Sequence, residues 1–215
     1  MKVAIFQFNL FGINTYIVYD PSSKECAVID PGMSNTEEEN AITSFIKDNN
    51  LTLKYIINTH LHIDHAIGNK FLKKKYDVPV LAHPDEEILG KSIQTQATSF
   101  GLRNKVDEVI IDKPLIPGEI IKIGDGELKV IDVAGHSPGG IALYDEKDGF
   151  VIVGDALFKQ SIGRTDLYGG NLKKLLKNIR ENLFTLPDDT LVLSGHGPTT
   201  TIEEEKKENP FLTDF

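Results

Sequence analysis

The sequence contains very little cysteine and has fewer basic than acidic residues. Cys26 is the only cysteine among 215 residues, which excludes an internal disulfide and a thiolate metal cluster. Lysine and arginine together number 23, against 32 aspartate and glutamate residues, so the formal charge is −9. Proteins that bind nucleic-acid backbones normally present a basic face. We therefore expect no nucleic-acid partner.

Long hydrophobic runs are also missing from the sequence. No apolar stretch approaches the roughly 20 residues that a membrane-spanning helix requires. The apolar start at residues 1–6 is too short for a signal peptide. These features predict a cytoplasmic protein with no membrane partner.

Apolar runs rich in β-branched residues alternate with amphipathic segments along the chain. Strands are expected at 3–8, 15–19, 25–29 and 54–58, and helices at 36–49, 66–76 and 172–182. Strands followed by helices occur twice in this order. The pattern predicts a mixed α/β fold (α+β) in which sheets are covered by helices. We expect one domain over residues 1–215, built from two similar halves at approximately 1–115 and 116–215.

The segment 59–65 reads Thr-His-Leu-His-Ile-Asp-His and holds three of the six histidines. It follows the predicted strand 54–58 directly. Imidazoles and carboxylates bind transition metals, and an ordinary surface loop has no reason to gather them. The segment therefore predicts a metal site at the end of a strand.

Three further candidate ligands also follow predicted strands, and each has a glycine beside it. They are His136, Asp155 and His196. A neighbouring glycine lets the backbone turn sharply and approach a bound group closely. Three such arrangements after three separate strands favour a shared site over coincidence.

The candidate ligands divide into two sites joined by one carboxylate. His60, His62 and His136 form the first site, Asp64, His65 and His196 form the second, and Asp155 bridges both. A carboxylate suits the bridge because it has two oxygens and offsets the charge of two close cations. A set of imidazoles and carboxylates without thiolate favours two divalent ions, zinc first, with iron or manganese as alternatives.

These motifs together resemble a known family. The T-H-x-H-x-D-H segment, Gly135-His136, Gly154-Asp155 and the 194–197 turn are similar to the metallo-β-lactamase superfamily, whose fold is a four-layer αββα sandwich. The segments 162–166 and 209–212 resemble the short glyoxalase II-like (hydroxyacylglutathione hydrolase-like) enzymes within it.

The resemblance implies a small-molecule hydrolase with two metal ions. A bridging hydroxide would attack a thioester, ester or lactone carbonyl, and Asp64 and Asp155 would be the catalytic carboxylates. The glyoxalase II substrate is S-D-lactoylglutathione, and another acyl thioester is equally compatible. Arg164 is a candidate contact for a substrate carboxylate or a salt-bridge partner of Asp166. Tyr168 is a weaker candidate contact.

Three other functions compete with this interpretation. The resemblance extends to the persulfide dioxygenases, in which His60, His136 and Asp155 would hold a single Fe(II). Residues 135–139 match the G-x-S-x-G nucleophile elbow, with Ser137 as the nucleophile, although a strand follows where an elbow requires a helix. A structural metal site would be closed and is often cysteine-rich, which this ligand set is not.

Overall fold

The computed structural model describes residues 1–102 and 105–212. The chain separates into two compact units. The first unit contains residues 1–115 and 122–126, and the second contains residues 116–121 and 127–215. The prediction that residues 1–215 form a single domain stays a prediction.

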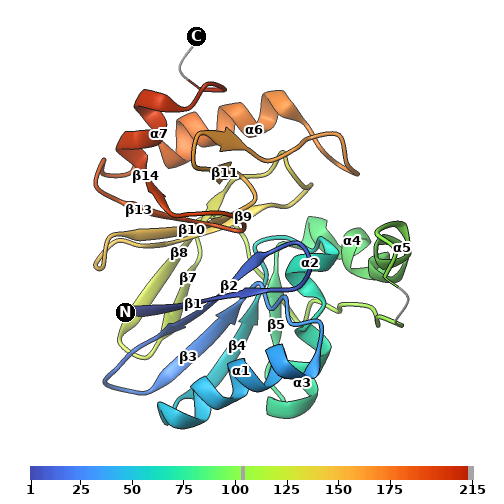
Figure 1. Cartoon of the computed structure of the whole chain (residues 1–215). Coiled ribbons are helices and arrows are strands. Elements are labelled where there is room, and N and C mark those ends of the chain that lie inside the picture. The colour runs from blue at the N-terminus through green and yellow to red at the C-terminus, as the bar shows by residue number, and fades with distance from the viewer. Residues whose placement is uncertain (103–104, 213–215) are drawn as a thin grey trace. The chain divides into compact units, whose positions relative to one another are not determined.

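The first unit is built on a six-stranded sheet with the order β1-β2-β3-β4-β5-β6 (Figure 1). Its strands are β1 (Lys2–Phe8), β2 (Ile13–Tyr19), β3 (Glu25–Ile29), β4 (Thr52–Ile57), β5 (Val80–Ala82) and β6 (Lys113–Pro114). β1 to β3 form an antiparallel meander, whereas β3 to β6 are parallel. The parallel strands therefore end at one common edge, and the histidine segment follows β4 at that edge.

Helices of the first unit supply the rest of its core. The helices are α1 (Thr36–Asp48), α2 (Ile63–Ala66), α3 (Asn69–Tyr76), α4 (Glu87–Lys91) and α5 (Ile93–Ser99). α1 begins where Asn35 Oδ1 accepts a hydrogen bond from the Glu38 amide, and Ile42 and Ile46 on its inner face join the apolar core. Its position agrees with the helix predicted at 36–49.

The helix predicted at 66–76 is wrong in its boundaries. It forms two helices, and the first begins earlier, so that Asp64 and His65 lie on α2. Gly68 separates the two helices, and its amide donates to the Pro31 carbonyl at 2.8 Å. A Cβ at Gly68 would lie 2.7 Å from that carbonyl oxygen, so the close approach requires glycine.

Most of the second unit is a six-stranded sheet with the order β14-β13-β10-β9-β8-β7 and a small hairpin, although residues 122–126, from the end of β7 to the start of β8, belong to the first unit. Its strands are β7 (Ile120–Ile123), β8 (Gly126–Asp132), β9 (Ile141–Asp145), β10 (Phe150–Gly154), β11 (Leu157–Phe158), β12 (Ser161–Ile162), β13 (Leu191–Ser194) and β14 (Thr200–Thr201). β9 is antiparallel to both β8 and β10, and β13 is parallel to β10. β8, β10 and β13 consequently run in one direction and end at the same edge.

Two helices, α6 (Leu172–Asn178) and α7 (Ile202–Glu208), cover this second sheet (Figure 1). Leu175 of α6 and Ile202 of α7 pack in one buried cluster with Val151 and Val192 of the strands. The helix predicted at 172–182 is α-helical only to Asn178 and continues as a π-helical turn, Ile179–Leu183. Two sheets with their helices confirm the predicted mixed α/β class. Within the described ranges, no helix is long and apolar enough to cross a membrane.

Candidate functional site

The first unit brings His60, His62, Asp64 and His65 together after β4. The three histidines are buried, with exposed fractions of 2%, 8% and 0%. The ring centroid of His60 lies 4.7 Å from that of His62 and 4.0 Å from that of His65. Asp64 Oδ2 lies 3.8 Å from His65 Nε2. The ligand types predicted from the segment are thus gathered within one unit.

Asp30, at the end of β3, fixes the orientation of two of these histidines. Its Oδ2 accepts hydrogen bonds from His65 Nδ1 at 3.0 Å and from Thr59 Oγ1 at 2.7 Å. The Thr59 hydroxyl donates its only hydrogen to Asp30, so it must accept a hydrogen bond from His60 Nδ1, which lies 3.1 Å away. Both rings therefore carry their proton on Nδ1, and Nε2 is left as the ligating atom in each.

The backbone of the histidine segment is held by two further side chains. Glu86, which is fully buried, accepts from the Leu61 amide at 2.8 Å. Gln96 accepts from the Ile63 amide at 3.0 Å and donates to the Leu61 carbonyl at 3.3 Å. These bonds fix the chain on both sides of His62, so the segment is braced by side chains from the α4–α5 region.

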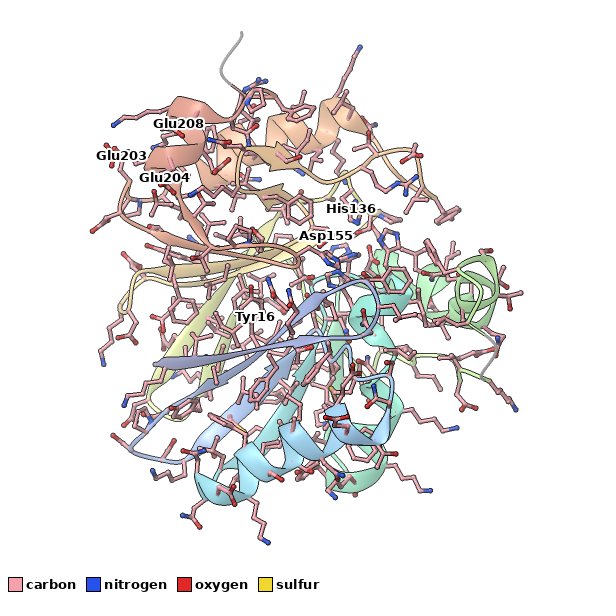
Figure 2. The ribbon with its side chains drawn as sticks, viewed as in Figure 1. Tyr16, His136, Asp155, Glu203, Glu204 and Glu208 are labelled. Carbon is pink, nitrogen blue, oxygen red and sulfur yellow. The ribbon has the colours of Figure 1, made fainter. Side chains whose placement is uncertain are left out.

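The second unit brings its three predicted ligands together at the edge where β8, β10 and β13 end. Asp155 Oδ2 lies 3.7 Å from His136 Nε2 and 3.6 Å from His196 Nε2. Figure 2 labels His136 and Asp155, which lie beside each other. The His196 side chain is the most accessible of the three, with 25% of its surface exposed. One carboxylate thus stands next to two imidazoles.

Main-chain groups position the ligands of the second unit. His136 Nδ1 lies 2.7 Å from the Arg164 carbonyl, which can only accept, so the ring again carries its proton on Nδ1 and presents Nε2. Gly163 makes this approach possible. A Cβ at Gly163 would lie 1.9 Å from the Asp155 carbonyl oxygen and 3.0 Å from His136 Nδ1.

The Arg164 side chain forms an ion pair. Its Nε and one terminal nitrogen donate to the two carboxylate oxygens of Asp166, each at 2.7 Å. These hydrogen bonds lower the pKa of Asp166 to about 2. Both side chains are mostly exposed, and Tyr168 nearby in the chain is exposed as well. The predicted substrate contacts of Arg164 and Tyr168 stay predictions.

The donor sets fit a divalent transition metal. Nitrogen and oxygen ligands about 2.0–2.1 Å from a tetrahedral ion lie roughly 3.4 Å from each other. The three separations between imidazole nitrogen and carboxylate oxygen, 3.8, 3.7 and 3.6 Å, are close to that value and longer than a hydrogen bond. Three histidines with a fixed Nδ1 proton are the ligand form that such ions require.

The nucleophile-elbow interpretation of Ser137 is wrong. The 135–139 turn connects β8 to β9, so it leads from strand to strand and not into a helix. Ser137 is also fully buried, and no substrate carbonyl can reach its hydroxyl. Cys26 is likewise buried, and burial raises the pKa of its thiol to about 12, which agrees with a packing role.

The sequence interpretation missed Asp30, Glu86 and Gln96. Asp30 adopts a left-handed backbone conformation, with φ at 50°, directly after β3. A carboxylate followed by Pro31-Gly32 at a strand end was the available signal for it. Gln96 lies in the segment 91–105, which gave no indication of a role.

Comparison with known proteins relates the chain to metal-dependent hydrolases. A family model described as the metallo-beta-lactamase superfamily matches residues 9–196. The chain is 39% identical to the "Probable metallo-hydrolase YqgX" of Bacillus subtilis (strain 168), over 90% of each chain. It is 34% identical to "Hydroxyacylglutathione hydrolase GloC" of Haemophilus influenzae, over 99% of this chain and 98% of the other. A crystal structure titled "TTHA1623 in a di-iron-bound form" matches with a TM-score of 0.86 and 32% identity, covering 97% of this chain and 100% of the other.

Proposed function

This chain belongs to the metallo-β-lactamase superfamily, and we propose that it is a metal-dependent hydrolase that cleaves a thioester or ester with two bound metal ions. The observation that carries the proposal is the pair of ligand sets, each at the edge of a sheet, in which His60, His65 and His136 keep Nε2 as the ligating atom. The hydroxyacylglutathione hydrolase relative supports an acyl thioester, with S-D-lactoylglutathione as one candidate.

The two sets would hold the ions jointly, as the sequence predicts. His60, His62 and His136 would bind the first ion, Asp64, His65 and His196 would bind the second, and Asp155 would bridge them. Within the second unit, Asp155 Oδ2 already lies at similar distances from His136 and His196, as a bridge requires. Zinc suits these ligands best, and the di-iron form of the relative makes iron the first alternative.

Asp64 and Asp30 would have different roles in the proposed hydrolysis. When bound, the ions supply a water whose pKa is lowered towards neutrality from about 15.7. Asp64 accepts a hydrogen bond from the attacking water and orients it towards the substrate carbonyl. Asp30 keeps the protons of His60 and His65 on Nδ1, so both rings present Nε2 as the ligating atom. No side-chain nucleophile is needed.

The test combines metal analysis with substrate trials on the purified protein. We expect about two divalent ions per chain and hydrolysis of acyl thioesters, lost on chelation and restored by added zinc. The trials should include S-D-lactoylglutathione, other acyl thioesters, lactones and β-lactams. A metal-loaded protein that hydrolyses no ester or thioester would overturn the proposal, whereas selective lactone hydrolysis would narrow it to a lactonase.

A mononuclear Fe(II) persulfide dioxygenase is the second candidate. It is supported by the resemblance of the sequence to the persulfide dioxygenases, and the Arg164 carbonyl orients His136, one of the three ligands that such an enzyme would use. In this case His60, His136 and Asp155 would hold one iron and leave positions for oxygen. One iron per chain, with oxygen consumption on glutathione persulfide, would establish it in place of the hydrolase.

A further inference from the structure

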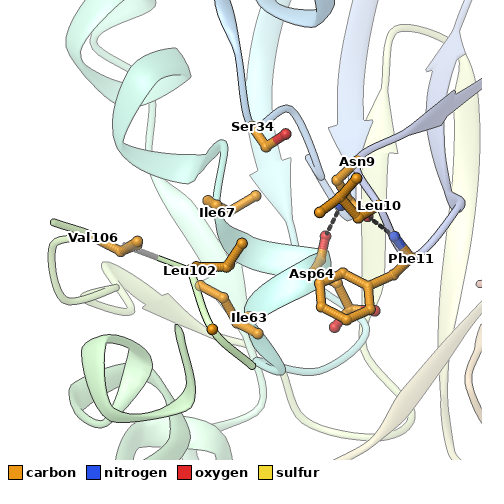
Figure 3. A pocket seen from close by; sticks show the side chains of 10 residues that line it. Asn9, Leu10, Phe11, Ser34, Ile63, Asp64, Ile67, Leu102 and Val106 are labelled. Carbon is orange, nitrogen blue, oxygen red and sulfur yellow. Dashed lines mark hydrogen bonds between the residues drawn. The ribbon is translucent and has the colours of Figure 1, made fainter. Parts of the chain in front are cut away.

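A cavity of about 230 Å³ opens beside Asp64 within the first unit (Figure 3). Its described walls come from the turn between β1 and β2, from helix α2, and from residues 101–102 and 106 beyond α5. Its lining residues are mostly apolar and comprise Asn9, Leu10, Phe11, Ser34, Ile63, Asp64, Ile67, Gly101, Leu102 and Val106. Because Asp64 is part of the wall, a molecule in the cavity lies next to a proposed metal ligand.

The turn between β1 and β2 is fastened to this wall through Asn9. The Asn9 side-chain amide donates to the main-chain carbonyls of Gly32 at 2.9 Å and Asp64 at 3.2 Å, and the Asn9 backbone amide donates to Glu38 Oε1 at 2.8 Å. Its Oδ1 in turn accepts from the Phe11 amide at 2.9 Å (Figure 3). These four bonds hold the tip of the turn, which carries Leu10 and Phe11, at a fixed place beside Asp64.

Apolar side chains on this turn and at the end of α5 are left in contact with water. Leu10 is 91% exposed, Phe11 38% and Phe100 48%. The rings of Phe11 and Phe100 meet edge to face, with centroids 5.4 Å apart. One exposed leucine needs no explanation, but a fixed group of three at the rim of an apolar cavity marks a binding surface.

The charge of the lining selects an uncharged occupant. Among the described lining residues, Asp64 is the only one with an ionisable side chain. A carboxylate or phosphate on a thiol carrier would find no cationic partner among these described lining residues. A hydrocarbon chain, in contrast, gains by leaving water in contact with Ile63, Ile67 and Leu102.

We propose that this cavity binds the acyl chain of the substrate and makes the protein selective for thioesters with straight apolar acyl groups longer than acetyl. This inference rests on the proposed hydrolase function. It differs from the lactoyl preference that the hydroxyacylglutathione hydrolase relative suggests, because lactoyl is short and carries a hydroxyl. The apolar side chains of the cavity wall hold the acyl chain, and the thioester carbonyl of the substrate lies at the end of the cavity next to Asp64.

An acyl series on one thiol tests the preference. Acetyl, butyryl and hexanoyl thioesters of N-acetylcysteamine share an uncharged leaving group. We expect kcat/KM to rise about fourfold for each methylene that leaves water, which makes the hexanoyl ester at least roughly 30-fold better than the acetyl ester. Equal values along the series would overturn the inference and leave the hydrolase function standing.

Two variants at the rim of the cavity test whether the acyl chain binds there. Leu10→Ser and Phe11→Ser remove apolar surface from exposed positions, and Ile88→Ser on α4 is the matched control, because Ile88 is 55% exposed and does not line the cavity. We expect the ratio of hexanoyl to acetyl kcat/KM to fall about fourfold or more in each rim variant and to stay unchanged in the control. An unchanged ratio in both rim variants would contradict the location.

A binding measurement separates this inference from the proposed reaction. Thioether analogues, in which a methylene replaces the carbonyl, cannot be hydrolysed. By calorimetry on the zinc-loaded protein, we expect the hexyl analogue to bind at least roughly 10-fold more tightly than the ethyl analogue. If no thioester is hydrolysed but the hexyl analogue still binds more tightly than the ethyl analogue, the proposed hydrolase reaction is wrong and the cavity assignment holds. If thioesters are hydrolysed and the difference is absent, the cavity assignment is wrong.

Discussion

The two units hold their ligands by different means. In the first unit the ligands lie within six consecutive residues, and side chains from other elements brace them: Asp30 fixes His60 and His65, while Glu86 and Gln96 hold the backbone. In the second unit the ligands come from three separate turns, and main-chain groups contact two of them. The Arg164 carbonyl accepts a hydrogen bond from His136 Nδ1, and the Asp155 carbonyl lies so close to Gly163 that a Cβ would not fit there. The first set should therefore be sensitive to side-chain changes outside the ligands, and the second set to added main-chain bulk.

Removing a carboxylate ligand from each set should have the largest effect. We expect Asp155→Ala to lose both ions and Asp64→Ala to lose one, because only Asp155 is proposed to bridge. Each loss removes several kcal/mol of transition-state stabilisation, so activity falls on the order of 1,000-fold or more. Metal content per chain by mass spectrometry distinguishes the two variants, with Asp107→Ala as the control because Asp107 pairs with Lys70 and lies outside the ligand set. Equal metal loss in both variants would show that Asp155 does not bridge the two ions.

Changing the brace of the first set should weaken metal binding without touching a ligand. Asp30→Asn keeps the size of the side chain but replaces one acceptor oxygen with an NH2 donor, so the side chain can no longer accept from the Thr59 backbone amide as well as from Thr59 Oγ1 and His65 Nδ1. We expect zinc affinity to fall roughly 10- to 100-fold, as for other partners of ligating histidines. Asp112→Asn is the matched control, since it breaks bonds to Lys73 and the Val80 amide in the same unit. Wild-type zinc affinity in Asp30→Asn would show that Asp30 only stabilises the fold.

Adding one methyl group should disturb the second set. A Cβ at Gly163 would overlap the Asp155 carbonyl oxygen, so Gly163→Ala must displace Asp155 or His136, and a displacement near 1 Å costs about 100-fold in activity. Gly149→Ala is the control. Gly149 has a φ of 68° and open space around it, so the change costs about 1 kcal/mol of stability from backbone strain and leaves the ligands in place. If both variants lose activity equally, main-chain crowding is not what positions Asp155.

The candidate ligands could be selected from sequence, whereas the residues that support them could not. His60 to His65 form a local pattern, and His136, Asp155 and His196 each follow a recognisable strand, so residue type and position were sufficient to propose them as ligands. The supporting bonds join distant residues: Asp30 lies 29 residues from Thr59, Glu86 lies 25 from Leu61, and Gln96 lies 33 from Ile63. No local periodicity encodes such pairs. The mixed α/β class followed from strand and helix patterns, but the break between α2 and α3 depends on contact with Pro31, again remote in sequence.

The exposed ion pair of the second unit should give the smallest effect. Hydrogen bonds from Arg164 lower the pKa of Asp166 to about 2 in the folded protein, below the ordinary value near 3.9 for an unfolded chain. A lowered folded pKa contributes stability above pH ~4, and that contribution is lost as the pH falls from about 4 to 2. Because both side chains are exposed, solvent screens the pair and unfolding should change little in Arg164→Gln. Carboxyl-carbon NMR provides the direct test: we expect the Asp166 midpoint near 2 in the wild type and near 3.9 in Arg164→Gln. An unchanged midpoint would mean that Arg164 does not hold Asp166 in solution and that its guanidinium is available to a substrate carboxylate.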